Sequence, residues 1–418
     1  MPLPRPPSVH PWDVPLGTRP SLWKQLRPAQ LFVGSFGLLV LLGTLGLKFL
    51  PGLYAGPELG WLDALFTSAS AVCVTGLIVV DTATYFTPRG QAFLLVLIQL
   101  GGLGMITFTS LILVALGRRL SLRQEALAGA GEVGPRVTPR QLVRDVARFT
   151  LALEAAGAAL LYLLWAPRFG WGQAAWPAVF HSVSAFCNAG FSTFSDSLIP
   201  FRESPLSLTV IMLLIVAGGI GFLPMEELYL WHRARRRGNS FRLSLHTQIV
   251  LATTTALLAG GWLLFALGEW GRTLRGLGFG HKLVNALFMS VTCRTAGFNT
   301  IDYARADEDT QFLTVLLMMI GGSPGSTAGG IKTTTFALLG ILAWSKLRGD
   351  EVATVRGRSL REETTDRAVG VFVIAFGVVT AGIFLLTKTE GATGWGGFLD
   401  RMFEAVSAFG TVGLSTGQ

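Results

Sequence analysis

The sequence predicts an all-α polytopic membrane protein, and three observations support this fold class. Half of its 418 residues are hydrophobic and only 14% are charged, whereas soluble domains carry about 25% charged residues. Several apolar runs are long enough to cross about 30 Å of hydrocarbon. A short motif also recurs four times along the chain, at residues 66–77, 180–191, 288–298 and 403–414.

Each copy of this motif begins with Phe and ends with Gly followed by Leu or Phe. The motif glycines Gly76, Gly190, Gly297 and Gly413 are 114, 107 and 116 residues apart, which indicates four copies of one structural unit. Eleven or twelve residues span about 17 Å as a helix, roughly half of the hydrocarbon core. We therefore expect a short re-entrant pore helix ending in a non-helical segment, which is tolerated at that depth only beside protein or a water-filled path.

The long apolar runs flank these motifs in a regular order. Runs at 31–50 and 92–116 enclose the first motif, 149–165 and 206–231 the second, and 249–267 and 312–344 the third, while 369–386 precedes the fourth. The fold expected is four pseudo-symmetric helix–pore-helix–helix repeats around a central ion pore. We divide the chain into a cytoplasmic tail 1–28, repeat 1 at 29–118, repeat 2 with its preceding cytoplasmic connection at 119–234, repeat 3 at 235–347, and an incomplete repeat 4 at 348–418.

A glycine pair recurs in each complete second helix, as Gly101-Gly102, Gly218-Gly219 and Gly321-Gly322. Such pairs allow close helix approach or bending, and we favour ordinary packing for the first two. The third pair opens a segment where Pro324 stands among glycines, so the helix should break into two pieces joined by a mobile loop. This gate segment comprises Gly321, Gly322, Ser323, Pro324, Gly325, Ser326, Thr327, Ala328, Gly329 and Gly330.

Lys332 follows the gate segment and has two interpretations. It could contribute to an electrostatic barrier or gate contact, or its side chain could extend to the cytoplasmic interface. A phosphate-binding loop is excluded because Ile331 separates Gly330 from Lys332, and that motif requires Gly-Lys-Ser/Thr after a strand.

The net charge is +9, from 34 basic and 25 acidic residues. The basic residues gather in the N-terminal tail and in the connections at 118–148, 233–242 and 346–367, a pattern that predicts a cytoplasmic N-terminus rather than nucleic-acid binding. The first 28 residues lack the apolar core of a cleavable signal. The three cysteines, Cys73, Cys187 and Cys293, all lie in the motifs without metal-ligand spacing, so we interpret them as small apolar residues.

Acidic residues follow three of the motif glycines by five or six positions: Asp81, Asp196 and Asp302. They could lie at the outer mouth of a pore and concentrate cations there, or they could cap the next helix. Arg294 lies three residues before Gly297 and needs a buried partner, for which Glu404 is a candidate. The five histidines are scattered and no HExxH occurs, so a membrane-embedded enzyme is a remote alternative.

The stretches 70–77, 184–191, 293–302 and 407–417, with 99–104 and 321–335, resemble the Trk/Ktr/HKT superfamily of potassium transporters. The resemblance covers nearly the whole chain beyond the tail and is nearest to the bacterial Ktr-type membrane subunit. It implies that backbone groups before and at each motif glycine form a potassium filter. The residues concerned are Val74, Thr75, Gly76, Asn188, Ala189, Gly190, Thr295, Ala296, Gly297, Thr411, Val412 and Gly413.

The same resemblance implies a multi-pass protein of the plasma (inner) membrane that takes up potassium, gated by the segment 321–330. It implies a homodimer docked on a cytoplasmic nucleotide-binding regulatory ring, with potassium as the transported ion, no covalently bound cofactor and no transition metal. Sodium-preferring plant relatives carry Ser where this chain has Gly76, which favours potassium; a sodium-permeable or sodium/potassium-coupled relative remains the alternative. The family pattern continues with a further membrane helix, so we expect the last helix of repeat 4 to be absent from this chain, which stops at Gln418.

Overall fold

The computed structural model describes residues 28–115, 139–349, 354–355, 358–359, 362–390 and 396–417. The predicted tail 1–28 therefore lies outside the described residues except for Pro28. Residues 116–138, which include part of the first basic connection, also lie outside them. Within them, five helices are long and apolar enough to cross a membrane, which confirms a mostly helical fold with several apolar helices. They are α2 (Pro28–Phe49), α5 (Pro88–Ala115), α7 (Pro139–Phe169), α11 (Leu245–Glu269) and α15 (Glu362–Glu390).

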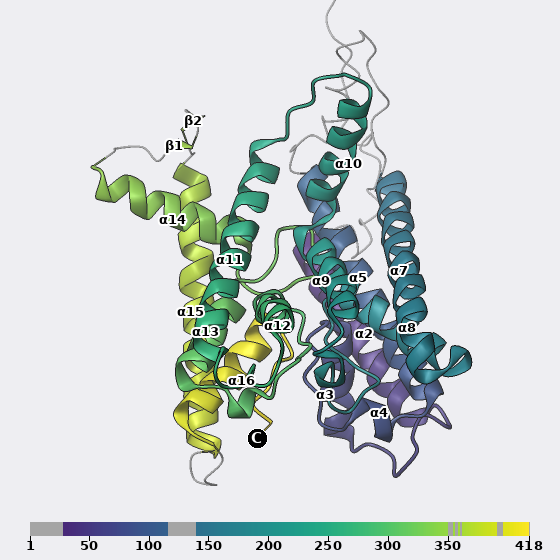
Figure 1. The fold of residues 1–418 in the computed structure, drawn as a ribbon. Coiled ribbons are helices and arrows are strands. Elements are labelled where there is room, and N and C mark those ends of the chain that lie inside the picture. Colours follow the sequence, from purple (N-terminus) through teal and green to yellow (C-terminus); the bar gives the residue numbers. More distant parts are fainter. Residues whose placement is uncertain are drawn as a thin grey trace, which may run out of the picture.

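Four shorter helices carry the repeated motifs. They are α3 (Trp61–Val72), α8 (Trp171–Phe186), α12 (Phe279–Thr292) and α16 (Phe398–Gly410). Each packs against the long helix that precedes it in the chain, α2, α7, α11 and α15 respectively. In Figure 1, α16 lies toward the lower end of the molecule, whereas α10 (Phe222–Arg236) and α14 (Thr333–Leu347) lie toward the upper end. Short turns α4 (Thr82–Tyr85), η1 (Ile199–Phe201) and η2 (Tyr303–Arg305) follow the first three motifs.

One small-residue contact joins each of the first three motif helices to its long helix. Ser68 Oγ donates to Val40 O at 2.7 Å, and a Cβ on Gly43, one turn further along α2, would overlap that hydroxyl. The same contact recurs between Ser182 and Glu154 O at 2.6 Å, and between Ser290 and Leu258 O at 2.9 Å. Gly157 and Gly261 occupy the position of Gly43. A hydroxyl on one helix and a glycine on the other thus set the same close approach three times.

The second helix of the second unit differs from the expected continuous run at 206–231. It is broken into α9 (Pro205–Ile220) and α10 (Phe222–Arg236), which are bent by 107°. Gly221 adopts φ +92 at the break, a conformation that glycine tolerates without a Cβ penalty. The corresponding region of the third unit is divided into α13 (Glu308–Met319) and α14 (Thr333–Leu347), with irregular chain over the segment where Pro324 and the glycines predict a break.

The first two glycine pairs lie where backbones approach closely. A Cβ on Gly101 would overlap Val72 O at the end of α3, and one on Gly218 would overlap Phe186 O at the end of α8. Close packing therefore accounts for both positions. One detail departs from an all-α fold, because β1 (Thr354–Val355) pairs antiparallel with β2 (Arg358–Ser359) as a two-stranded hairpin.

Candidate functional site

The segment after each motif helix adopts the same unusual backbone conformation. The motif glycines have φ values of +84, +70, +78 and +89 for Gly76, Gly190, Gly297 and Gly413. The residue two positions earlier is also left-handed in every copy, with φ between +50 and +75 at Val74, Asn188, Thr295 and Thr411. A left-handed β-branched residue is a costly conformation that persists only where the surrounding structure imposes it, and such residues cluster at functional sites.

The four segments meet one another in a closed ring. A Cβ on any motif glycine would come within 2.8 Å or less of the carbonyl oxygen just before the next motif glycine. Gly76 faces Ala189 O, Gly190 faces Ala296 O, Gly297 faces Val412 O and Gly413 faces Thr75 O. Because the last contact returns to the first segment, the four non-helical segments surround one centre in chain order, and only glycine fits at each position.

A hydroxyl near the end of each motif helix fixes the chain around the glycine. Ser70 Oγ donates to Leu77 O at 2.7 Å, Ser184 Oγ to Phe191 O at 2.8 Å and Thr292 Oγ1 to Phe298 O. In the fourth copy, Ser407 Oγ instead accepts from Gly413 N at 3.1 Å. These hydroxyls were not predicted from the sequence, although each precedes its motif glycine by five or six residues, and that spacing was a signal for them.

A cavity of about 490 Å³ opens on this ring. Its lining includes all four motif glycines and two carboxylates, Asp81 and Glu404. Asp81 also caps α4, accepting from Ala83 N at 3.0 Å, and it accepts from Ser195 Oγ at 2.6 Å. Burial raises the pKa of Asp81, but hydrogen bonds from Ser195, Thr84 and the backbone of Ala83 outweigh burial and lower it below its usual value. Asp81 therefore caps α4 and also lines the cavity beside the ring.

The other two expected mouth residues lie elsewhere. Asp196 and Asp302 line a separate cavity of about 780 Å³, together with Arg202, Arg272 and Arg305. Asp302 caps η2 through Ala304 N at 3.1 Å and pairs with Arg305 at 3.2 Å, so the capping interpretation holds for it. The offset from the glycine fixes distance along the chain but not the direction in which the loop leaves the ring.

Glu404 also lines the cavity beside the ring, whereas the sequence suggested that it pairs with Arg294. It accepts from Ser415 Oγ at 2.6 Å and from Thr416 N at 3.0 Å. Arg294, its expected partner, is buried and donates to Gly321 O at 3.0 Å. The two side chains thus have different partners, and the hypothesis of an Arg294–Glu404 pair was wrong. Arg294 instead joins the third motif to the first residue of the gate segment.

The gate segment is held against the second unit by backbone hydrogen bonds. Ser323 N donates to Gly219 O at 2.9 Å and Phe222 N donates to Gly325 O at 3.0 Å. The segment therefore docks on the break between α9 and α10. The side chain of Thr327 donates to Phe186 O at 3.1 Å at the end of α8. A Cβ on Gly329 would overlap the Thr411 hydroxyl, so the same segment also reaches the fourth motif.

Lys332 is half-buried and turns back onto the gate segment. Its Nζ donates to Ala328 O at 2.5 Å and to Gly329 O at 3.4 Å. These partners are the segment's own carbonyl groups, so the ammonium group is engaged by the segment that precedes it. The Nζ group therefore contacts backbone carbonyls of the segment itself, and a role in gating stays a prediction.

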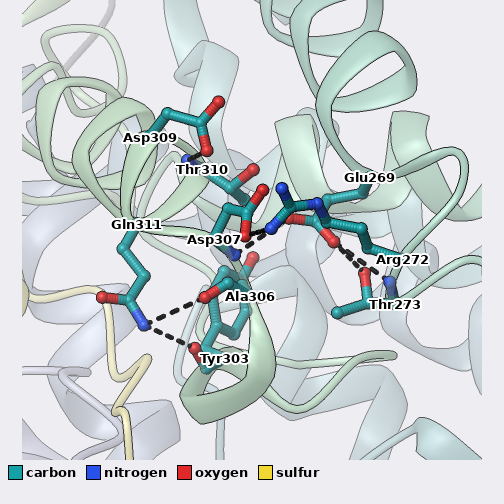
Figure 2. A network of polar contacts seen from close by, with 9 residues as sticks. All are labelled: Glu269, Arg272, Thr273, Tyr303, Ala306, Asp307, Asp309, Thr310 and Gln311. Atoms are coloured by element: carbon teal, nitrogen blue, oxygen red, sulfur yellow. Dashed lines mark hydrogen bonds and ion pairs between the residues drawn. The ribbon is translucent and has the colours of Figure 1, made fainter.

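A polar network fixes the loops around the third unit (Figure 2). Glu269 Oε2, at the end of α11, accepts from Thr273 Oγ1 at 2.6 Å, and Glu269 Oε1 accepts from Asp307 N at 3.3 Å. Asp307 is also ion-paired with Arg272. Gln311 Nε2 donates to Tyr303 O at 3.0 Å and to Ala306 O at 3.4 Å. This network ties the turn after the third motif to α11 and α13. In the first unit, Gln91 Nε2 likewise donates to Thr82 O and Phe86 O.

The described residues include no cluster of three or more His, Cys, Asp or Glu side chains that could hold a metal ion. What converges at the ring is backbone carbonyl oxygen. Carbonyl groups of this kind suit a weakly bound, dehydrated alkali cation.

The spanning helices and the ring of glycine segments between them define an integral membrane protein with its candidate site enclosed by the helices. The chain matches the TrkH family of cation transport proteins over residues 38–418 and belongs to that family, whose members are transporters rather than enzymes. The resemblance recognised from the motifs is thereby confirmed.

Several relatives match over most of their length. The chain is 39% identical to "Ktr system potassium uptake protein B" of Bacillus subtilis over 398 residues, covering 94% of this chain and 87% of that protein. It is 36% identical to "Potassium/sodium uptake protein NtpJ" of Enterococcus hirae over 398 residues, covering 94% and 86%. Its fold is similar to the crystal structure of the potassium transporter TrkH from Vibrio parahaemolyticus, with a TM-score of 0.73, 20% identity and coverage of 93% and 76%.

Proposed function

We propose that this chain takes up potassium across the cell membrane through a central pore formed by four pseudo-symmetric repeats. The observation that carries the proposal is the closed ring of four segments, each with a left-handed residue and a left-handed glycine. The filter consists of the twelve residues assigned from the sequence, at 74–76, 188–190, 295–297 and 411–413. Relatives that share 39% identity are named as potassium uptake proteins, which supports the choice of ion.

The chemistry of such a filter follows from the backbone. A dehydrated potassium ion needs oxygen ligands in place of its water shell, and a ring of carbonyl groups supplies them. The four motif helices also end at the ring, and the C-terminal end of a helix carries a partial negative charge. Asp81 and Glu404 in the mouth cavity add negative charge at one entrance. Inward flow would follow the membrane potential, which is worth about 2.3 kcal/mol per charge per 100 mV; coupling to sodium or protons is left open.

We assign gating to the segment 321–330 with Lys332. Its hydrogen bonds to the α9–α10 break and its approach to Thr411 support a position across the path below the filter. The segment is mostly buried, but its glycines permit more than one backbone conformation, which makes it a suitable two-state element. Arg294, which donates to Gly321 O, links the filter side of the third repeat to this segment.

The partners follow from the family. We propose a homodimer in the plasma (inner) membrane with a cytoplasmic N-terminus, docked on a cytoplasmic nucleotide-binding regulatory ring. The basic residues at the end of α10, Arg233, Arg235 and Arg236, are available for that docking and also satisfy the positive-inside pattern.

A second candidate is a sodium-permeable transporter. The relative named "Potassium/sodium uptake protein NtpJ" favours it, whereas Gly76 favours potassium because the sodium-preferring plant relatives have Ser there.

Rubidium and sodium uptake should be measured in cells that lack their own potassium uptake systems and express this chain with a Ktr-type regulatory partner. The potassium filter is supported if the wild type takes up rubidium in preference to sodium and the Gly76→Ser variant gains sodium uptake. Gly56→Ser is the matched control, because Gly56 is exposed in open space. Equal uptake of the two ions by the wild type would support the second candidate.

A further inference from the structure

A buried acidic side chain lies behind the second filter segment, and the proposed pore does not use it. Glu154 lies in the middle of α7 and is 4% exposed. Its Oε2 accepts from Gln99 Nε2 of α5 at 3.0 Å. The Cys187 thiol lies 3.7 Å from Gln99 Oε1 and 3.9 Å from Glu154 Oε1, within hydrogen-bond reach of both. Three elements far apart in the sequence thus meet in one polar cluster.

This cluster is next to the ring. Cys187 caps the end of α8 and directly precedes Asn188, the left-handed residue of the second segment. The Glu154 main chain is fixed to the same helix, since Glu154 O accepts from Ser182 Oγ at 2.6 Å. A Cβ on Gly102 would lie 2.7 Å from Cys187 Sγ, so α5 closes the cluster from the other side. Glu154 therefore contacts the α8 region at two points, Ser182 within the helix and Cys187 at its C-cap.

No cation balances this carboxyl among the described residues. α7 packs against α5, α8 and α9. The charged residue of α5 is Arg89, in its first turn, and α9 carries no titratable side chain. In α8, His181 is engaged by Pro177 O and Ser192 Oγ.

The remaining charges of α7 lie away from the cluster, in residues 140–148 and at Arg168. None of the ion pairs found in the described part of the chain includes Glu154. A buried acidic side chain is expensive in a membrane protein and is retained where it has a function.

We propose that Glu154 is a positioning residue that, through Gln99 and Cys187, fixes the second filter segment and so sets ion selectivity. The inference rests on the proposed function of the ring. The contact requires a carboxyl or amide oxygen that accepts from Gln99 and does not require a charge. Without that acceptor, the partly buried Gln99 amide and the buried Cys187 thiol lose their fixed partner, and the carbonyls that follow Cys187 lose their alignment.

The test compares Glu154→Ala, Glu154→Gln, Gln99→Ala and the double variant Glu154→Ala/Gln99→Ala by rubidium and sodium uptake in the full chain. We expect Glu154→Ala to lower the preference for rubidium over sodium about tenfold, corresponding to about 1.4 kcal/mol. Glu154→Gln should retain the wild-type preference, and the double variant should be no worse than the more impaired single variant. Leu151→Ala is the control, because Leu151 is on the same helix and 55% exposed.

Unchanged selectivity in membrane-inserted Glu154→Ala overturns the inference while leaving the proposed function intact. Equal loss in Glu154→Gln and Glu154→Ala also overturns it, because the charge would then be what matters. If Glu154→Ala fails to insert into the membrane, Glu154→Asp takes its place. The shorter side chain moves the acceptor oxygen away from Gln99, so the selectivity of Glu154→Asp should be lower than that of Glu154→Gln. Equal selectivity of these two variants contradicts the inference. Absence of ion uptake by the inserted wild type contradicts the proposed function itself, and the inference with it.

Discussion

The side-chain amide of Asn188 and the hydroxyl oxygen of Thr327 are 2.8 Å apart, although 139 residues separate them in the sequence. Asn188 belongs to the second filter segment and Thr327 to the gate segment. Both side chains are buried, so their contact is protected from water and is costly to leave unsatisfied. The same hydroxyl also donates to Phe186 O at 3.1 Å. One threonine thus connects the proposed gate to the ring on which it closes.

Replacing Thr327 by Val should loosen the gate segment. The substitution retains the shape of the side chain but removes both hydroxyl contacts, each worth about 1 kcal/mol. Basal rubidium uptake in the absence of the regulatory partner should rise by about fivefold, if one contact matters for gating, to about thirtyfold, if both do. Thr209→Val serves as the control, because the Thr209 hydroxyl is exposed and bonds only within its own helix, to Pro205 O. Basal uptake equal to wild type in Thr327→Val would contradict a gating role for this contact.

Lys332 offers an independent test of the same element. Lys332→Met removes the ammonium group that donates to Ala328 O and Gly329 O and keeps most of the side-chain length. We expect higher basal uptake and a smaller response to the regulatory partner, with Lys332→Arg intermediate because it keeps the charge in a different shape. Uptake should be recorded with and without the partner. If Lys332→Met regulates normally, the ammonium group has no part in the gate.

Asp81 should act at the mouth over the whole physiological pH range. Its pKa is lowered, so the carboxylate form is the one favoured by the fold. Its contribution to stability is present above the ordinary carboxyl pKa and is lost only as pH falls through the lower, folded-state value. Titration of Asp81 should therefore cause no change in rubidium uptake between pH 8 and pH 5.

Asp81→Asn should raise the KM for rubidium about two- to threefold at low ionic strength and less at high salt, because screening weakens attraction by a mouth charge. Asp302→Asn provides the comparison, since Asp302 lies in a separate cavity. Equal effects of the two variants would show that neither acts through the mouth of the ring.

Much of this organisation follows from local sequence. The repeated motif predicts four short helices, and α3, α8, α12 and α16 carry those motifs. Pro324 among glycines predicts the interruption between α13 and α14, because proline and glycine oppose helix by local backbone chemistry. By contrast, the 107° bend after Ile220 was not predicted, although Gly221 and Pro224 follow it in the sequence. Gly221 adopts a positive φ there, and the neighbouring Phe222 N donates to Gly325 O, so the bend also depends on a tertiary contact.

The contacts that the sequence could not supply join distant residues. Glu154 is a single acidic residue in an apolar run, and its partners Gln99 and Cys187 are 55 and 33 residues away. The same limit explains Asp196 and Asp302, which follow their glycines by six and five residues, close to the five of Asp81, but whose loops lead to another cavity. Spacing specifies a repeated backbone, whereas the direction of each loop depends on packing that differs among the repeats.

The central claim is that four equivalent glycine-centred segments form one ion filter. It is tested most directly by rubidium uptake into liposomes containing the purified chain and each of the single variants Gly76→Ala, Gly190→Ala, Gly297→Ala and Gly413→Ala. Each added Cβ would meet a carbonyl oxygen of the neighbouring segment at a positive φ, and Gly56→Ala is the control. The account predicts rubidium uptake by the wild type and the control, with selective uptake lost in all four ring variants. A ring variant that retains the rubidium uptake and selectivity of the wild type would contradict the claim of a single four-segment filter.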